Sequence, residues 1–300
     1  MLPVPGRTWQ EAAPSGAKYR SMGILRAILP LALALSVSAP AAATDSQIPV
    51  TVYAHRGGAA IGPENTMAAF EQAGALFAAA GVDGWLELDT QASADGTLVV
   101  IHDHTLDRTT DCAGTVIDWT YDASCNAAKR WPSFGHQPVP KLADLLARGR
   151  QATPAWGLMI EIKNIPYETN FDPAGMLVAD SLVAMIDASG YPKDRIIVQS
   201  FWPPSLDRVE LLDPELDTML LTTSQLGFMV WQNALYATAR GYEISAPEWQ
   251  SADFRAETVA AAHALGRRVI TWTVDSRAAG DALIAMGVDG IITNDPRIFL

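Results

Sequence analysis

Short apolar, β-branched runs alternate along most of the chain with longer stretches that carry apolar residues at helical spacing. The predicted strands are residues 51–54, 85–89, 158–163, 195–200, 217–222, 242–246, 268–273 and 290–293. The predicted helices are residues 65–80, 141–150, 174–189, 203–212, 225–240, 254–265 and 277–286. This alternation indicates parallel strands joined by crossover helices.

The number of these units predicts how the sheet is arranged. Eight strands with intervening helices in about 250 residues are typical of a closed (β/α)8 TIM barrel, an α/β fold. A doubly wound open sheet is the alternative. In a barrel, side chains that follow the C-terminal ends of the strands lie at the face where barrel enzymes carry out their chemistry.

One apolar run, 98–101, interrupts the alternation because no helix fits between it and the second strand. A turn signal at Asp95-Gly96 precedes it. We expect residues 86–102 to form a hairpin that extends the second strand past the barrel rim, which keeps the barrel at eight strands. A turn centred on Asp95-Gly96 would place His102 opposite Asp89.

Residues 1–43 have the pattern of a secretory signal peptide. Arg20 and Arg26 supply positive charge, an apolar run follows, and three alanines at 41–43 form a small-residue cleavage site. The apolar run is too short to span a bilayer, which takes about 20 residues. We therefore expect the mature protein to be periplasmic or secreted, without a stable membrane anchor.

Two boundaries follow from this leader. Met22 is a second possible start, in which case residues 1–21 are a start-site extension. Residues 44–300 form the expected barrel domain. Within it, residues 105–139 are rich in Asp, Thr, Trp and Pro, and we expect them to form a loop insertion at the top of the barrel.

The insertion contains the two cysteines of the chain, Cys112 and Cys125. An even, closely spaced pair in an exported chain predicts one disulfide that closes a short loop.

Composition and charge narrow the possible partners. The chain has 300 residues, of which 49% are hydrophobic and 18% charged, as expected for a large folded core. Without residues 1–43 it keeps 17 Lys and Arg against 32 Asp and Glu, a net charge of −15. Nucleic acid favours basic surfaces, so we expect a small-molecule ligand and no nucleic acid. The sequence leaves the oligomeric state open.

Acidic side chains recur at the ends of predicted strands. Strand alternation places Glu87 and Asp89 on one face, with Leu88 on the other. Glu161 and Lys163 repeat this arrangement on a second strand. Inward carboxylates are costly unless they are paired or bind a cation. Three of them form a hard-oxygen site suited to Ca²⁺ or Mg²⁺, and a Glu–Lys ion-pair network is the alternative.

Two histidines also follow strand ends. His55-Arg56 ends the first strand and His102 ends the hairpin. Imidazole titrates near neutral pH and can act as general base or general acid. Arg56 and Lys163 can neutralise phosphate oxygens, Arg with a bidentate fork. Glu64 is placed to orient Arg56 or His55.

Six stretches, in order, resemble the glycerophosphodiester phosphodiesterase family over nearly all of the chain from residue 51. They are AHRGGAAIGPENTMAAF (54–70), LELDTQASADGTLVVIHDHTLDRTT (86–110), IEIK (160–163), QSF (199–201), TWTVD (271–275) and GVDGIITNDP (287–296). The resemblance implies hydrolysis of a glycerophosphodiester to glycerol 3-phosphate and an alcohol. It implies His55 and His102 as the catalytic pair. It also implies a divalent metal ion on Glu87, Asp89 and Glu161, with Arg56 and Lys163 near the phosphate.

The chain departs from the family pattern in three places. The segment after Arg108 contains the two cysteines, Trp202 and two prolines follow Phe201, and Asn294 stands where the family commonly has Asp. We expect these departures to affect substrate choice and loop architecture, and neither the metal site nor the histidines. Trp272 is either a wall against the substrate's glycerol or a core residue packed between a strand and a helix.

Two other functions stay open. Phospholipases of the C or D kind also use a histidine pair and a carboxylate-bound metal on a similar barrel. The chain has no evident basic amphipathic segment for docking on anionic membranes, which favours a soluble substrate. A non-catalytic phosphodiester-binding protein is the second alternative, but binding alone requires neither a base nor an acid.

Overall fold

The computed structural model describes residues 50–223 and 229–300, so the predicted signal peptide lies outside the described residues. One sheet runs in the order β1-β9-β8-β7-β6-β5-β4-β2-β3, and a further parallel pairing of β1 with β2 closes eight strands into a barrel. The strands are β1 (Thr51–Ala54), β2 (Trp85–Ala92), β3 (Leu98–Val100), β4 (Gly157–Ile162), β5 (Ile196–Ser200), β6 (Asp217–Thr222), β7 (Ile244–Pro247), β8 (Arg268–Thr271) and β9 (Gly290–Thr293). The prediction of a closed barrel is confirmed, and the open sheet is excluded.

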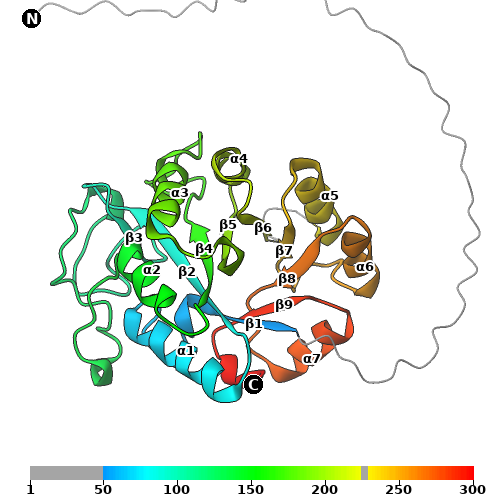
Figure 1. Cartoon of the computed structure of the whole chain (residues 1–300), viewed down its shortest axis with the longest axis horizontal. Coiled ribbons are helices and arrows are strands. Elements are labelled where there is room, and N and C mark those ends of the chain that lie inside the picture. Colours follow the sequence, from blue (N-terminus) through cyan, green and yellow to red (C-terminus); the bar gives the residue numbers. More distant parts are fainter. Residues whose placement is uncertain (1–49, 224–228) are drawn as a thin grey trace, which may run out of the picture. The chain divides into compact units, whose positions relative to one another are not determined.

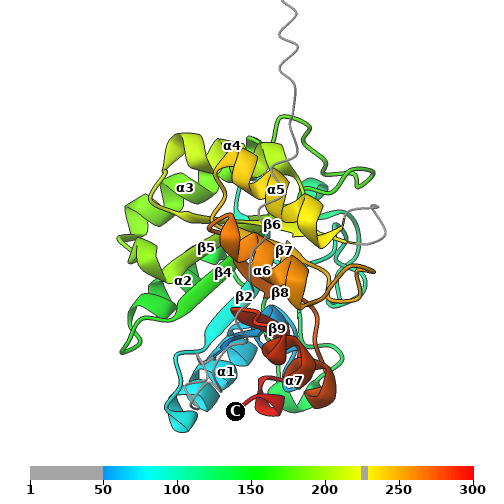
Figure 2. The same cartoon turned by 90° about the vertical axis from the view of Figure 1, so that its right-hand side faces the viewer.

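Seven α-helices of the described residues surround the ring of strands (Figure 1). They are α1 (Met67–Ala80), α2 (Leu142–Arg150), α3 (Leu177–Ser189), α4 (Pro203–Leu212), α5 (Val230–Arg240), α6 (Ala256–Ala264) and α7 (Arg277–Ala285). The view turned by 90° shows α5 and α6 outside β7 and β8 (Figure 2). After β9 the chain forms only a short 3-10 turn at Pro296–Ile298. No helix in these two ranges is long and apolar enough to cross a membrane.

Strand alternation divides the core into two layers. Leu88, Ile160 and Val198 face outward and pack with helix residues such as Phe70. The barrel interior is filled by a second apolar cluster: Tyr53, Met159, Ile197, Met219, Leu221, Ile244, Ala246, Ile270 and Ile292. On β4, Met159 belongs to this interior cluster and Glu161 follows two residues later on the same face. The polar site therefore lies directly above the apolar interior.

The predicted hairpin is present, but its register differs from the prediction by one residue. Thr90 pairs with Val100, and Ile101 N donates to Asp89 O at 3.0 Å. Ile101 rather than His102 therefore lies opposite Asp89. The physical reason is a loop of five residues, 93–97, in which Ser93 N donates to Thr97 O at 3.0 Å.

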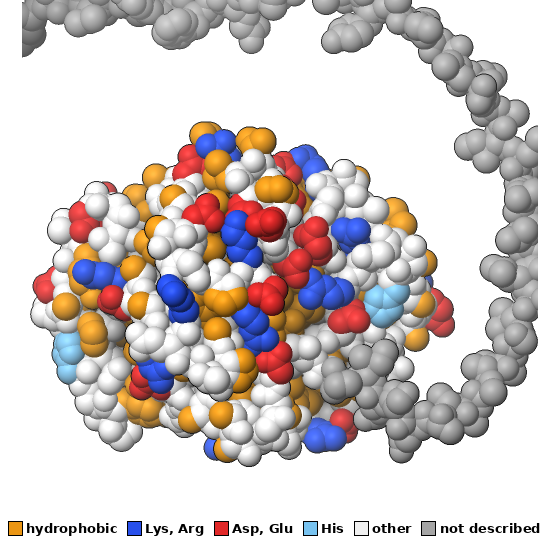
Figure 3. All heavy atoms as spheres, viewed as in Figure 1, with side chains coloured by type: hydrophobic (Ala, Val, Ile, Leu, Met, Phe, Trp, Pro, Cys, Tyr) orange, Lys and Arg blue, Asp and Glu red, His pale blue; other side chains and the backbone are white. Residues whose placement is uncertain are grey.

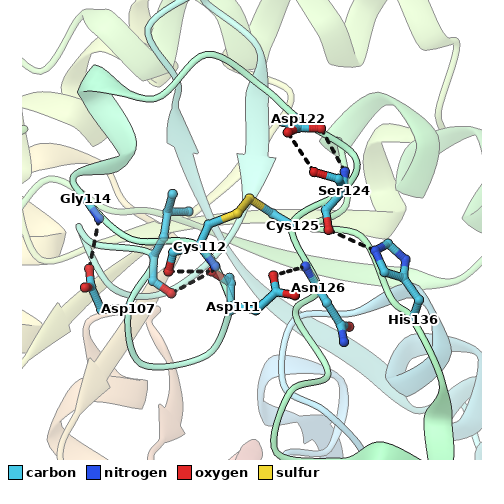
Figure 4. The surroundings of a disulfide bond; sticks show 11 residues. Asp107, Asp111, Cys112, Gly114, Asp122, Ser124, Cys125, Asn126 and His136 are labelled. Atoms are coloured by element: carbon cyan, nitrogen blue, oxygen red, sulfur yellow. Dashed lines mark hydrogen bonds between the residues drawn. A yellow bond between two sulfur atoms is a disulfide. The ribbon is translucent and has the colours of Figure 1, made fainter.

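The segment 105–139 lies beside β3 and α2 (Figure 1). Together with residues of and around β3 it forms a small core of its own: Val99, Ile101, Leu106, Val116, Cys125 and Val139. The predicted disulfide between Cys112 and Cys125 is confirmed and joins two loops of this segment (Figure 4). Asp111 accepts a hydrogen bond from Asn126 N at 2.7 Å beside it.

Candidate active site

Three carboxylates converge at the C-terminal end of the barrel. In the parallel pairing of β2 with β4, Asp89 lies next to Glu161, and Glu87 precedes Asp89 on the same face of β2. All three side chains are buried, and each offers an oxygen within 4.8 Å of the others. The convergence that strand alternation predicts is therefore present.

The pKa values of these carboxyls diverge because their surroundings differ. Burial raises the pKa of Glu87 well above its usual range, and the charges of Asp89 and Glu161 add to the effect. Burial also raises the pKa of Glu161, although Lys163 opposes it. At Asp89 burial acts in the same direction, but the charges of His102, Lys163 and Arg56 outweigh it and hold the pKa well below normal. The cluster therefore carries mutual repulsion that a bound cation would relieve.

Buried oxygen atoms that accept no hydrogen bond indicate whether a cation fits among the carboxylates. Asp89 Oδ1 and Gln199 Oε1 are buried and accept no hydrogen bond from the described residues. Gln199 lies on β5 beside Glu161, and its Nε2 donates to Glu87 Oε1 at 2.8 Å. Carboxylate and amide oxygens are the donors that Mg²⁺ and Ca²⁺ prefer. The donor set fits a hard divalent cation.

A tight turn after β1 directs Arg56 toward the carboxylates. Arg56 has a φ of 53° and Gly57 a φ of 78°, both in the left-handed region. This conformation suits Gly57, where a Cβ atom would lie 2.8 Å from the ring of Phe70. The turn places Arg56 N as donor to Glu87 Oε2 at 2.7 Å.

The side chain of Arg56 lies between two acidic residues. Its Nη1 donates to Glu64 Oε1 at 2.9 Å, and its Nε lies 3.6 Å from Asp89 Oδ2. Asn65, also left-handed with a φ of 56°, donates through Nδ2 to the same Asp89 oxygen at 2.8 Å. Of the two residues that Glu64 was expected to orient, Arg56 and His55, the structure shows a hydrogen bond with Arg56.

Lys163 completes the group of charges. Its Nζ lies 2.8 Å from Glu161 Oε1 and 3.8 Å from Asp89 Oδ1. The side chain is buried, and it faces the carboxylates as the alternation along β4 predicts.

His55 is held by a residue from the other end of the chain. Its Nδ1 lies 2.6 Å from Asn294 Oδ1, and its Nε2 lies 4.0 Å from Glu87 Oε2. The Nδ2 of Asn294 donates to Asp275 Oδ2 at 2.7 Å. Burial, reinforced by the charge of Arg56, lowers the pKa of His55 to about 4. The expectation that Asn294 leaves the histidines untouched is wrong, because β9 pairs with β1 and brings Asn294 to His55.

His102 is held through both its side chain and its backbone. Its Nδ1 lies 2.7 Å from Asp103 Oδ1. Gln91 Nε2 donates to the carbonyl oxygens of Ile101, His102 and Asp103 at 3.0, 3.1 and 2.7 Å. The loop that carries His102 is therefore fixed to β2.

Trp272 lies just after β8. Its Nε1 donates to Ala246 O at 3.0 Å, and its ring packs edge-on against Phe201 with centroids 5.4 Å apart. Both rings cover the interior apolar cluster of the barrel. Trp272 is thus partly buried and packs on the barrel interior rather than between a strand and a helix, and its contact with substrate stays a prediction.

Several residues of the site were not anticipated from the sequence: Asn65, Gln91, Asp103, Gln199, Asp275 and Asn294, together with Arg108, which contacts Glu64 and Asp103. Gln91 and Gln199 are buried polar residues on strands. Gln91 shares the phase of Glu87 and Asp89 on β2, so strand alternation was a signal that could have found it. The others depend on turns or on contacts between distant segments.

Comparison with known proteins gives a consistent result. Residues 55–298 match the model of the glycerophosphoryl diester phosphodiesterase family. A glycerophosphodiester phosphodiesterase of Bacillus altitudinis is 33% identical over 254 residues, which cover 82% of this chain and 94% of that protein. One from Caldanaerobacter subterraneus subsp. tengcongensis is 33% identical over 256 residues, covering 83% and 96%.

Two solved structures share the fold. That of a glycerophosphodiester phosphodiesterase from Agrobacterium tumefaciens str. C58 has a TM-score of 0.65 at 26% identity, covering 83% of this chain and 99% of that one. A phosphodiesterase of Oleispira antarctica, in complex with the product sn-glycerol-3-phosphate, has a TM-score of 0.70 at 22% identity, covering 83% and 94%.

Proposed function

This chain belongs to the glycerophosphoryl diester phosphodiesterase family and is a phosphoric diester hydrolase, and we propose that it acts with a divalent cation and two histidines. The observation that carries the proposal is the group of three buried carboxylates, Glu87, Asp89 and Glu161, next to unpartnered acceptor atoms. Lys163 and Arg56 supply two positive charges beside this group, but three buried carboxylates remain unfavourable without further positive charge. Oxygen donors favour Ca²⁺ or Mg²⁺.

A bound divalent cation would supply positive charge to the phosphoryl oxygens and stabilise the charge that builds up on them in the transition state. Arg56 and Lys163 add fixed positive charge at the same face of the barrel. The guanidinium of Arg56 is held by Glu64, so its direction is set before substrate binds. Fixed charges of this kind favour the transition state because they need no reorganisation during the reaction.

We propose that one of His55 and His102 is the general base and the other is the general acid. The kinetics of the His55→Ala and His102→Ala variants will assign the two roles. Each Nδ1 faces an oxygen acceptor, so each Nε2 is the nitrogen available for proton transfer. One histidine removes the proton of the attacking oxygen, from water or from the glycerol 2-hydroxyl. If the 2-hydroxyl attacks, the alcohol leaves and a cyclic glycerol phosphate forms, which water then opens to glycerol 3-phosphate. The other donates a proton to the leaving alkoxide.

The proposed substrate is a small glycerophosphodiester, and the products are glycerol 3-phosphate and an alcohol. The Oleispira antarctica phosphodiesterase was solved with sn-glycerol-3-phosphate, which supports this choice. Nucleic acid is a poor match to a chain of this charge. On the face drawn in Figure 3, Lys and Arg side chains lie among Asp and Glu side chains rather than in a continuous basic area.

We further propose that residues 1–43 direct export and that residues 44–300 form the mature domain. The disulfide in the insertion supports this proposal, since such bonds persist in oxidising compartments. Sequencing the N-terminus of the protein recovered from the periplasm or medium tests it. An intact leader on a cytoplasmic protein would contradict export.

The central experiment measures glycerol 3-phosphate release from a panel of glycerophosphodiesters, with a diacyl phospholipid included, before and after exhaustive chelation. Activity on the deacylated diesters should vanish with chelator and return with added Mg²⁺ or Ca²⁺. Glu161→Gln should bind the cation more weakly in calorimetry, whereas Glu71→Gln, an exposed site on α1 that pairs with Arg148, should not. Full activity in the chelated enzyme would refute the cation, and activity on the diacyl lipid alone would refute the substrate.

A further inference from the structure

Arg108 belongs to the insertion and bridges two carboxylates of the site. Its Nε and Nη2 donate to Asp103 Oδ2 and Oδ1 at 2.5 and 2.9 Å. Its Nη1 and Nη2 donate to Glu64 Oε2 and Oε1 at 2.8 Å each. Both carboxylates are therefore engaged bidentately by one guanidinium, the strongest geometry available to an Arg–carboxylate pair.

Each of these carboxylates holds a different functional group. Asp103 accepts from His102 Nδ1 at 2.7 Å, and Glu64 accepts from Arg56 Nη1 at 2.9 Å. Arg108 is thus the link between a proposed proton-transfer group and a proposed phosphate-binding group.

The charge balance depends on this link. Asp103 and Glu64 are partly buried, and Arg108 with Arg56 offsets their two negative charges. Removing one partner of such a network leaves a carboxylate that must find another donor or turn toward water. For Asp103, that movement would release the ring of His102.

The insertion fixes Arg108 from both sides along the chain. Leu106 is fully buried in the small insertion core, and Thr110 Oγ1 donates to Leu106 O at 2.8 Å. Cys112, in the disulfide with Cys125, follows four residues after Arg108. The backbone that carries the guanidinium is therefore tied to a folded unit and does not hang freely over the site.

We propose that Arg108 is a positioning residue that sets the orientation of His102 through Asp103 and of Arg56 through Glu64. This inference rests on the proposed function. It assigns a role in the chemistry to the insertion, which the sequence led us to associate with substrate choice and loop architecture.

The test compares Arg108→Ala and Arg108→Lys with Arg195→Ala in the full chain. Arg195 makes a comparable bidentate pair with Asp83, at 2.8 and 2.7 Å, at the opposite end of the barrel. We expect kcat of Arg108→Ala to fall about 10–100-fold, as for other supporting residues of active sites, with a smaller change in KM. Lys has one point charge and no fork, so Arg108→Lys should remain impaired. Arg195→Ala should keep wild-type kcat.

Chemical rescue separates positioning from general destabilisation. Millimolar guanidinium chloride should restore part of the kcat of Arg108→Ala, whereas sodium chloride at equal ionic strength should not. Wild-type kcat in Arg108→Ala or Arg108→Lys would overturn the inference, as would a loss of kcat that follows a loss of Tm and is not rescued. His102→Ala is assayed alongside. If His102→Ala keeps wild-type kcat, the proposed acid–base pair itself fails.

Discussion

Each of the two histidines turns its Nδ1 atom toward an oxygen that accepts a hydrogen bond. Asn294 must present its Oδ1 to His55, because its Nδ2 donates to the Asp275 carboxylate, which can only accept. His102 faces the charged Asp103 instead. In both rings Nε2 is therefore the free nitrogen. The rings differ in the partner of Nδ1, which is a neutral amide for His55 and a charged carboxylate for His102.

This arrangement predicts that both histidines are needed for turnover. His55→Ala and His102→Ala should each lower kcat by about 10²–10⁴, the usual range for general acid–base catalysis. A substrate with a nitrophenyl leaving group needs no protonation of that group, so it should rescue the variant that has lost the acid and not the other. Wild-type kcat on the natural diester in either variant would contradict the pair.

The support behind His55 can be tested without changing the ring. Asn294→Leu removes the acceptor for Nδ1, and we expect kcat to fall about 10–100-fold with an unchanged fold. Asn294→Asp keeps an acceptor at the same atom and should retain more activity than Asn294→Leu. Equal kcat values for wild type and Asn294→Leu would show that the contact has no catalytic role.

At this scale, the sequence predicted what a strand's alternation determines. Two pairs of charged residues were predictable in this way: Glu87 with Asp89, and Glu161 with Lys163. The members of each pair are two residues apart on the predicted strand, so they share a face. Asn65 was not predictable, because its contact with Asp89 requires a left-handed backbone at a turn. The contacts of Asn294 with His55 and of Arg108 with Glu64 join residues far apart in sequence, and no local pattern carries that information.

Among the elements, the insertion is the one whose disulfide was predictable from the sequence but whose contact with the site was not. Its composition set it apart, and the cysteine spacing indicated the bond. The hairpin before it was predicted as an element, and its register failed by one residue because a five-residue loop cannot be distinguished from an even-numbered turn by the Asp95-Gly96 signal alone.

Breaking the disulfide should therefore affect the insertion more than the barrel. Replacing both cysteines by Ser removes a constraint worth about 3 kcal/mol by the chain-entropy estimate for a loop of this length. We expect faster amide hydrogen exchange within 105–139 and a weaker affinity for substrate, with a smaller change in the barrel's unfolding midpoint. Unchanged exchange in the insertion of the double variant would refute this.

At the scale of the whole molecule, acidic residues also lie close to one another on the outside of the barrel. Glu210 on α4 accepts from Thr218 Oγ1 at 2.5 Å. Burial raises the pKa of Glu210, and the nearby carboxylates Glu243, Asp207 and Asp217 raise it further. A carboxyl whose pKa is raised by folding lowers the stability of the protein at pH values above that folded pKa.

Glu210→Gln should therefore raise the unfolding midpoint at neutral pH, since the amide keeps the acceptor for Thr218 and removes the charge. The gain should shrink as the pH falls and disappear below about pH 4, where Glu is protonated in both states. Glu215→Gln, an exposed site paired with Lys193, should give no such gain. If Glu210→Gln raised the unfolding midpoint by the same amount at neutral pH and below about pH 4, the charge of Glu210 would be excluded as the cause.

The contact between His55 and Asn294 spans 239 residues, almost the full distance from the first strand to the last. During synthesis, the carboxylates and the first histidine leave the ribosome long before Asn294, the residue that orients His55. Closure of the barrel by β9 and completion of the active site are thus one event. A nascent chain, or a fragment that stops before Asn294, would hold nearly all of the catalytic side chains but lack the group that orients His55, so it should turn over substrate more slowly than a chain in which β1 and the residue after β9 have met.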